Sequence, residues 1–308
     1  MIYLTVMGRC GNQMFQYAFA RRMAEIQKDQ ITINFGELQS FSVDDSSGFC
    51  DELSHFCAVS NYKKIETKED LVRKFGSKKQ RAVYRIYKLL RKFYGRLGIN
   101  PKRANSQFRF LLSSVGIFTD TTFRKKKFEL DRIGEENIFI KGYFEEPDYF
   151  QPIKELLYKD FVPLNSVSER NALMLERIQA ENSICVSFRK WDVRGREICG
   201  EEYYRRAFEY FNKTIANPTF VIFSNDVDWV KRNFALPDHC IFESGENPVW
   251  EKVLLMSSCQ HFIITNSTFA WWIQYLGKNK NKIVVAPSKW FESQKQADPL
   301  FLKEFIEV

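Results

Sequence analysis

The chain has 308 residues, enough for about two domains, and its 44% hydrophobic and 27% charged residues are typical of a globular protein. No apolar run approaches the roughly 18 residues of a membrane-spanning helix. Seven scattered cysteines without a C-x-x-C pair, and only three histidines, argue against a zinc centre or a disulfide framework. The apolar start lacks the basic residues and cleavage site of a signal peptide, so we expect a cytoplasmic protein.

The first half of the chain, residues 1–160, predicts one Rossmann-like domain. Strands are expected over residues 2–7, 31–34 and 138–143, with helices over 13–26 and from 149 to 158. Residues 36–60 are rich in Ser, Asp and Gly and predict a loop.

The positive charge of the chain is concentrated in a helical insertion over residues 70–105. Between Arg73 and Arg103 there are twelve Lys or Arg and no acid. Apolar residues at helical spacing predict a basic amphipathic helix; they are Val83, Ile86, Leu90, Phe93 and Leu97. This segment, 73–103, either contacts an anionic membrane surface as a peripheral helix or packs its stripe on the domain. Nucleic-acid binding is not expected, because no RNP, KH or zinc-finger pattern accompanies the charge.

The second half, residues 161–308, alternates strands and helices. Strands are predicted over 184–189, 219–224, 240–243, 261–265 and 282–286, with helices over 202–215, 227–234, 248–258 and 268–276. This alternation predicts an α/β domain with a parallel sheet. Ligands of such sheets lie beyond the carboxyl ends of the strands. The loops after Met7, Arg189, Ser224 and Thr265 are therefore the candidate binding loops.

The first loop, Gly8-Arg9-Cys10-Gly11-Asn12-Gln13, leads directly into a helix. Its glycines allow a ligand close to the backbone, and the helix N-terminus offers N–H groups. The alternative is a tight structural turn with Asn12 as the helix cap. The spacing is neither G-x-G-x-x-G nor a P-loop, which excludes dinucleotide and Walker-type sites.

The second loop carries Ser187, Arg189, Lys190 and Asp192 at a strand end. Two adjacent cations suit a diphosphate, and Asp192 could hold the Arg189 fork in place. The alternative is a surface salt-bridge cluster.

The third and fourth loops add polar side chains at two further strand ends. Asp226 and Asp228 form a D-x-D string, but their position favours a helix cap and first turn over a metal site. Asp226 could also hydrogen-bond a nucleobase or ribose. The fourth loop combines the hydroxyls of Ser267 and Thr268 with a helix N-terminus, an anion-binding arrangement, and Trp271 and Trp272 are expected in the core. Several phosphate-binding loops without a metal cluster indicate a nucleotide-sugar ligand.

Several motifs resemble glycosyltransferase family 11, the α-1,2-fucosyltransferases. The opening Gly8–Ala18 is similar to that family's G-R-L-G-N-Q-M-F-Q-Y-A, and further similar segments follow in order. They are Gly142-Tyr143-Phe144 with Tyr149-Phe150, Phe223–Asp226, Leu255–Cys259 with Asn266–Trp272, and Ala286-Pro287 with Trp290-Phe291. The match runs from residue 1 to about 291 and is poor over 36–130.

The resemblance implies an α/β fold of GT-B architecture, with two Rossmann-like domains facing a cleft. It implies a metal-independent inverting α-1,2-fucosyltransferase that needs no cofactor and moves fucose from GDP-fucose to a galactose-type hydroxyl of a glycan, for example a lipid-linked one at the inner face of a bacterial membrane. Donor-binding roles carry over to the second domain and to the first loop. They fall on Gly11, Ser187, Lys190, Asp192, Asp226, Asn266, Ser267, Thr268 and Phe269. The resemblance implies catalytic roles for Arg189 and for Asn12.

The second-domain motif departs from the family's H-x-R-R-x-D. Ser187 replaces the His and Lys190 the second Arg, while Arg189 and Asp192 are retained. Arg189 is the expected stabiliser of charge on the leaving GDP. The departures leave open a different donor or linkage, or a catalytically dead nucleotide- or glycan-binding protein. Three carboxylates are candidates for the general base; they are Glu145, Asp192 and Glu197.

Overall fold

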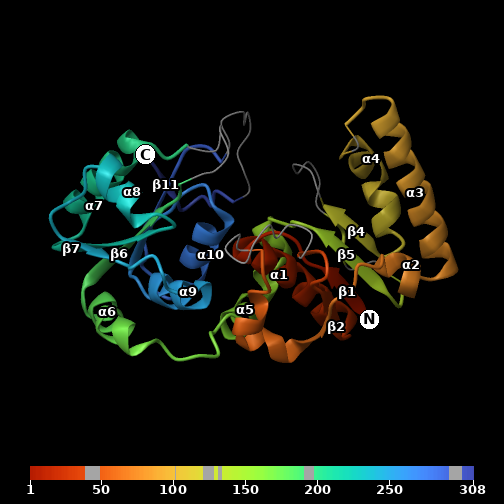
Figure 1. Cartoon of the computed structure of the whole chain (residues 1–308), viewed down its shortest axis with the longest axis horizontal. Helices are drawn as coiled ribbons and strands as arrows, with labels where there is room; N and C mark the ends of the chain where they lie inside the picture. Colours follow the sequence, from red (N-terminus) through yellow and green to blue (C-terminus); the bar gives the residue numbers. More distant parts are fainter. Residues whose placement is uncertain (39–48, 101, 121–127, 131–133, 191–197, 291–299) are drawn as a thin grey trace. The chain divides into compact units, whose positions relative to one another are not determined.

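The computed structural model describes residues 1–38, 49–100, 102–120, 128–130, 134–190, 198–290 and 300–308. The chain divides into two compact units, Met1–Phe161 and Val162–Val308, each built around one parallel sheet (Figure 1). Among the helices that the structure describes, none has the length and apolar character needed to cross a membrane.

Unit 1, Met1–Phe161, contains a five-stranded parallel sheet in the order β3-β2-β1-β5-β4. Its strands are β1 (Ile2–Thr5), β2 (Ile31–Asn34), β3 (Tyr62–Ile65), β4 (Ile117–Asp120) and β5 (Ile138–Gly142). The central strands are apolar because both of their faces are buried. The strands predicted near 2–7, 31–34 and 138–143 are confirmed, whereas β3 and β4 occupy stretches without a predicted strand. The strand order reverses between β1 and β5, which makes their carboxyl ends the place where a ligand is expected.

The helices of unit 1 include the predicted basic insertion. They are α1 (Cys10–Gln27), α2 (Leu71–Phe75), α3 (Lys78–Arg96), α4 (Lys102–Ser113) and α5 (Lys154–Asp160), with 3₁₀ turns at Leu53–His55, Cys57–Asn61, Pro147–Tyr149 and Gln151–Ile153. The prediction of one helix across 73–103 is wrong, because three helices cover this stretch. Ser77 begins α3 with a capping box to Gln80, and Gly98, at a φ of 68°, follows its end. The helices α3 and α4 pack side by side (Figure 1).

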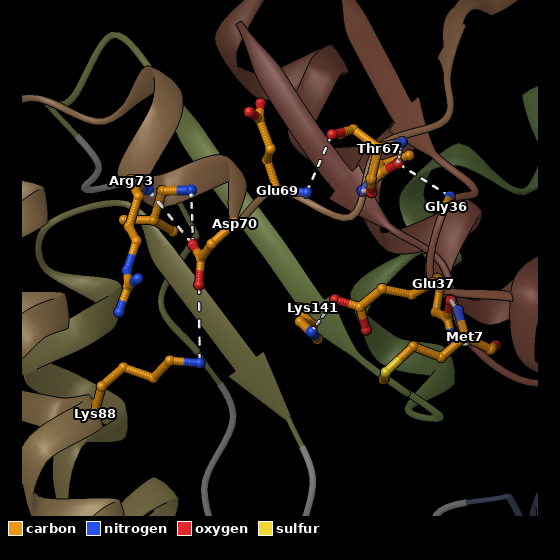
Figure 2. A network of polar contacts seen from close by, with 12 residues as sticks. Met7, Gly36, Glu37, Thr67, Glu69, Asp70, Arg73, Lys88 and Lys141 are labelled. Carbon is orange, nitrogen blue, oxygen red and sulfur yellow. Dashed lines mark hydrogen bonds and ion pairs between the residues drawn. The ribbon is translucent and has the colours of Figure 1, made fainter. Parts of the chain in front are cut away.

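Asp70 joins α2 to α3 through several contacts (Figure 2). Its carboxylate accepts hydrogen bonds from the N–H of Val72 at 3.1 Å and from the hydroxyl of Tyr84 at 2.9 Å. The ammonium of Lys88 lies 3.8 Å away. One face of α3, with Tyr84 and Tyr87, is buried in a cluster of apolar side chains. The cluster also contains Leu112 of α4, Ile117 of β4 and Phe139 of β5. The insertion is therefore a packed part of unit 1.

Unit 2, Val162–Val308, contains a six-stranded parallel sheet in the order β11-β10-β9-β6-β7-β8. Its strands are β6 (Asn182–Phe188), β7 (Pro218–Ser224), β8 (Cys240–Phe242), β9 (His261–Ile263), β10 (Val284–Ala286) and β11 (Ile306–Glu307). Its helices are α6 (Glu169–Ala180), α7 (Glu201–Thr214), α8 (Val227–Asn233), α9 (Val249–Ser257) and α10 (Thr268–Leu276). The predicted alternation is confirmed, with α6 and β11 added. This is the doubly wound order in which the direction of strand progression changes between β6 and β9.

Candidate functional site

The loops after β6, β7 and β9 meet at one edge of the unit 2 sheet. β6 pairs in parallel with β7 on one side and with β9 on the other, so the residues that follow these strands lie at neighbouring carboxyl ends. Ligands of doubly wound sheets bind at such a switch point. The predicted residues that the structure brings to this edge are Ser187, Arg189, Lys190, Asp226, Asn266, Ser267, Thr268 and Phe269.

The end of β6 presents two cations. Arg189 and Lys190 follow the strand directly and are half-buried, while Ser187 is buried within it. The carbonyl of Ser187 accepts a hydrogen bond from the hydroxyl of Tyr204 at 2.9 Å, which ties the strand end to α7. Asp192, predicted to orient Arg189, lies outside the described residues.

Asp226 and Lys190 form a pair across the ends of β6 and β7. The Lys190 ammonium lies 2.7 Å from Asp226 Oδ2, and Asp226 Oδ1 accepts from the N–H of Trp229 at 2.8 Å, capping α8. The Lys190 hydrogen bond, and then that of the Trp229 N–H, lower the pKa of Asp226. The predicted cap is confirmed. Asn225, a residue that the sequence did not single out, accepts from the Lys190 N–H at 2.9 Å and donates to its carbonyl at 3.1 Å.

The D-x-D string offers little to a metal ion, because both carboxylate oxygens of Asp226 are used in these contacts and Asp228 is exposed in the first turn of α8. Within the described parts of the chain, no group of three or more His, Cys, Asp or Glu side chains is arranged to hold a metal ion.

The turn after β9 positions the N-terminus of α10. Asn266 is buried and donates through Nδ2 to the carbonyl of Trp290 at 3.0 Å. Ser267 is the cap residue of α10, but its hydroxyl makes no capping hydrogen bond to the helix. Ser267, Thr268 and Phe269 are half-buried beside the N–H groups of the first helical turn. Hydroxyl residues at a helix N-terminus suit a phosphate. The next two residues, Trp271 and Trp272, are fully buried, as predicted.

Tyr203 of α7 supports this turn from the core. Its hydroxyl donates to the carbonyl of Ile264 at 2.5 Å, with the carbonyl of Val285 at 3.2 Å. Tyr203→Phe is expected to lower the free energy of unfolding by about 1–3 kcal/mol, because it leaves a buried carbonyl without its donor. Thermal unfolding measures the effect. Tyr210→Phe, on the same helix, is the matched control. Equal melting temperatures for the two variants would contradict the supporting role of Tyr203.

The first loop of unit 1 differs from its predicted form. α1 begins at Cys10 with Arg9 as the cap residue, so Asn12 lies in the first turn and the alternative in which it caps the helix is wrong. Gly8 has a φ of 76°, and a Cβ there would lie 2.5 Å from Nδ2 of Asn12. A side chain at position 8 is therefore disfavoured by both the backbone and the space. Gly11 is buried and Asn12 half-buried.

Two glutamines of α1 that the sequence did not single out hold this loop in place. Gln16 donates to the carbonyl of Met7 and accepts from its N–H, both at 2.9 Å. Gln13 donates to the carbonyls of Gly8 at 3.1 Å and Cys50 at 2.7 Å, and accepts from the N–H of Glu52. Two glutamines within the mainly apolar first half of α1 are the available signal in the sequence. Part of the N-Q-M-F-Q motif thus has a structural role.

The end of β5 completes the switch point of unit 1. Phe144 has a φ of 50°, unusual for a bulky residue, and its buried ring stacks on Phe19 with centroids 4.1 Å apart. Glu145 follows and is half-buried; of the three candidate bases, only this one is described. Nearby, Lys141 of β5 forms an ion pair with Glu37, which lies beyond β2 (Figure 2).

The known proteins that this chain resembles include α-1,2-glycosyltransferases. An α-1,2-colitosyltransferase from Escherichia coli is 27% identical over 206 residues, 60% of this chain and 69% of that protein. A galactoside α-(1,2)-fucosyltransferase 1 from Aotus azarae is 24% identical over 161 residues, 47% of this chain and 44% of that protein, less than half its length. The solved structure of a FUT1 mutant from Arabidopsis thaliana in complex with GDP matches with a TM-score of 0.52 at 11% identity. That match covers 92% of this chain and 69% of the other.

The structural match confirms the predicted GT-B fold class, with its two Rossmann-like units. The model of glycosyl transferase family 11 matches residues 1–308, the whole chain. The chain therefore belongs to glycosyltransferase family 11 and is a glycosyltransferase.

Proposed function

We propose that the chain is an inverting, metal-independent α-1,2-fucosyltransferase that uses GDP-fucose. The observation that carries this proposal is the switch point of unit 2, where Arg189 and the Asn266–Phe269 turn follow adjacent strands. Family membership and the GDP-bound structural relative support the choice of nucleotide. The enzyme needs no cofactor in this proposal, since the donor itself carries the leaving group.

Each loop has a part in this proposal. The hydroxyls of Ser267 and Thr268 and the N–H groups of α10 hold the diphosphate, and Phe269 packs on the sugar or the base. Arg189 donates to the diphosphate as negative charge builds on the leaving GDP. Lys190 and Asp226 act as a pair, since an ion pair joins them across the ends of β6 and β7. Ser187, Asp192 and Gly11 complete the proposed set, with Asn12 as the catalytic contribution of unit 1.

The reaction is a single displacement at the anomeric carbon. An acceptor hydroxyl attacks, the bond to the diphosphate oxygen breaks, and GDP leaves with both electrons of that bond. The hydroxyl proton passes to a carboxylate, for which Glu145 at the switch point of unit 1 is the described candidate. Inversion follows from one displacement on the face opposite the leaving group.

The acceptor in this proposal is a galactose-type hydroxyl of a glycan, as in the name of the Aotus relative. A lipid-linked glycan is the proposed form of the acceptor. The colitosyltransferase relative, together with Ser187 and Lys190 in place of the family's His and Arg, favours a second candidate in which colitose replaces fucose.

The nucleotide is tested by thermal shift with GDP, UDP, CDP and dTDP. GDP is expected to raise the melting temperature most, because ligand at 100 times its dissociation constant adds about 2.7 kcal/mol of stability. A larger shift with any other nucleotide would overturn the GDP assignment. A shift with GDP but no turnover on any acceptor would indicate a nucleotide-binding protein without catalysis.

The sugar and the linkage are tested by NMR analysis of the product. Incubation with GDP-fucose and galactoside acceptors in the presence of EDTA is expected to give an α-1,2-linked fucose. Activity that requires added Mg²⁺ or Mn²⁺ would contradict the metal-independent mechanism. The same assay is repeated with a donor that carries colitose in place of fucose. Efficient transfer of colitose with no transfer of fucose would favour the second candidate.

A further inference from the structure

The helix α3 has a second apolar face that no other described element covers. Tyr84 and Tyr87 face the core of unit 1, whereas four large apolar side chains on the other side are more than half exposed to solvent. They are Ile86 at 54%, Leu89 at 60%, Phe93 at 53% and Leu97 at 57%. At 3.6 residues per turn, these positions fall within about a quarter of the helix circumference. They form one continuous row along the outer side of the helix.

This row differs from the stripe predicted from the sequence. Val83 and Leu90 are half-buried, whereas Ile86, Phe93 and Leu97 are exposed and are joined by Leu89. The predicted stripe therefore does not lie on a single face of α3. One face packs on unit 1, and a separate apolar face is exposed. The tyrosines supply the packed face, which leaves the aliphatic residues and Phe93 exposed.

A row of cations runs beside the exposed apolar row. Arg81, Arg85, Lys92 and Arg96 are exposed, and their helical spacing places them in the sector next to Ile86 and Leu89. Among the described residues, none of these four forms an ion pair. Other cations of α3 do, since Lys79 pairs with Glu135 and Lys88 lies against Asp70 (Figure 2). The unneutralised cations thus gather on the side that also carries the apolar row.

These two rows, Ile86, Leu89, Phe93 and Leu97 with Arg81, Arg85, Lys92 and Arg96, form the outer face of α3. We propose that the outer face of α3 docks on an anionic lipid bilayer. Water is an unfavourable environment for four large apolar side chains. The four cations beside them have no acidic partner among the described residues, so a negatively charged surface complements this face. An apolar row flanked by cations is the pattern of helices that lie in a membrane interface.

The neighbouring helix also exposes large apolar side chains. Phe110 and Leu111 of α4, which packs against α3, are each 48% exposed. The proposal does not depend on which sugar the enzyme transfers, because it rests on the outer face of α3 alone. Docking would bring unit 1 to the membrane surface, where a lipid-linked acceptor would be found.

Co-sedimentation of the full chain with lipid vesicles tests the proposal. Vesicles of phosphatidylcholine with about a third phosphatidylglycerol are expected to bind the chain, whereas vesicles of phosphatidylcholine alone bind it far more weakly. High salt should weaken the binding, since the attraction of surface charges is screened. Absence of binding to the anionic vesicles, or equal binding to both kinds, would overturn the proposal.

Two variants locate the contact on the outer face of α3. Replacement of Arg81, Arg85, Lys92 and Arg96 by Gln is expected to weaken binding several-hundredfold, at about fivefold for each cation. Leu89→Gln with Phe93→Gln should weaken it by about tenfold or more for each side chain. Exposed residues tolerate such changes, and melting temperatures verify that the variants fold.

Matched controls come from unit 2. The charge control replaces the exposed Lys213, Lys278, Lys280 and Lys303 by Gln, and the apolar control is Leu173→Gln, at a side chain that is 71% exposed. Both controls are expected to bind vesicles almost as the wild type does. If the controls lose as much binding as the α3 variants, the contact is not at α3 and the proposal fails. The same holds if the α3 variants bind as the wild type does.

Discussion

Arg189→Ala is expected to lower the rate of sugar transfer about 100- to 1000-fold, because a donor to the developing negative charge is worth about 3–4 kcal/mol in the transition state. Arg189 follows β6 directly, at the switch point of unit 2. The interaction strengthens as GDP leaves, so the loss should appear mainly in kcat. Initial rates of GDP release at saturating donor measure it.

Arg189→Lys separates charge from geometry. Lysine keeps the positive charge but cannot donate two parallel hydrogen bonds to a diphosphate, so an intermediate rate is expected. Arg177→Ala is the control, since this exposed arginine of α6 pairs only with the nearby Glu181 in the described contacts. Near wild-type rates for Arg189→Ala, with an unchanged melting temperature, would remove Arg189 from the mechanism.

The fold of unit 2 could be predicted because its strands are short apolar runs separated by amphipathic helices. β6, β7 and β9 are buried almost throughout, and such runs are visible in a sequence. β3 was not predicted because Lys63 and Lys64 occupy its centre, where the strand lies at the edge of the sheet and is exposed. Local composition cannot show that β2 offers an edge with which these residues pair.

The predicted loops are at strand ends, but the sequence could not show which of their polar side chains form hydrogen bonds or ion pairs with other residues of the chain. Lys190 was expected to add charge at the diphosphate, yet its ammonium pairs with Asp226 and its backbone with Asn225. These contacts join residues 35 or 36 positions apart, so no local pattern reveals them. In the same way, Gln16 holds Met7 through contacts that depend on how α1 turns back over β1.

The replacement of the family's His by Ser187 has a defined structural setting. Ser187 is buried in β6, and its carbonyl is held by Tyr204. Tyr204 in turn stacks on Phe188, with ring centroids 3.8 Å apart. The backbone position of Arg189 is thus fixed by α7, and the side chain at 187 is not needed for it. This is why Arg189 stays the proposed catalytic residue despite the changed motif.

Asp160→Ala is expected to destabilise unit 1 by about 3–5 kcal/mol, the cost of removing one partner from a buried charged network. Asp160 is 7% exposed and accepts hydrogen bonds from Tyr17 at 2.8 Å, Asn61 at 2.8 Å and Arg21 at 3.1 Å. Burial, and then the Asp160 carboxylate, raise the pKa of Tyr17, so its hydroxyl remains a donor. The variant leaves the Tyr17 hydroxyl without its acceptor and removes one of the two carboxylates that pair with Arg21, the other being Glu25.

Asp160 lies at the end of α5, and two of its three partners are on α1, the helix whose first turn forms part of the Gly8–Asn12 loop. Loss of the carboxylate should therefore loosen the loop as well as lower the melting temperature, by roughly 10 °C for a unit of this size. Glu155→Ala, an exposed change on the same helix, should shift stability by less than about 0.5 kcal/mol. If Asp160→Ala melts as Glu155→Ala does, the network does not hold α1 against α5. The orientation of the Gly8–Asn12 loop would then depend on other contacts, those of Gln13 and Gln16 among them.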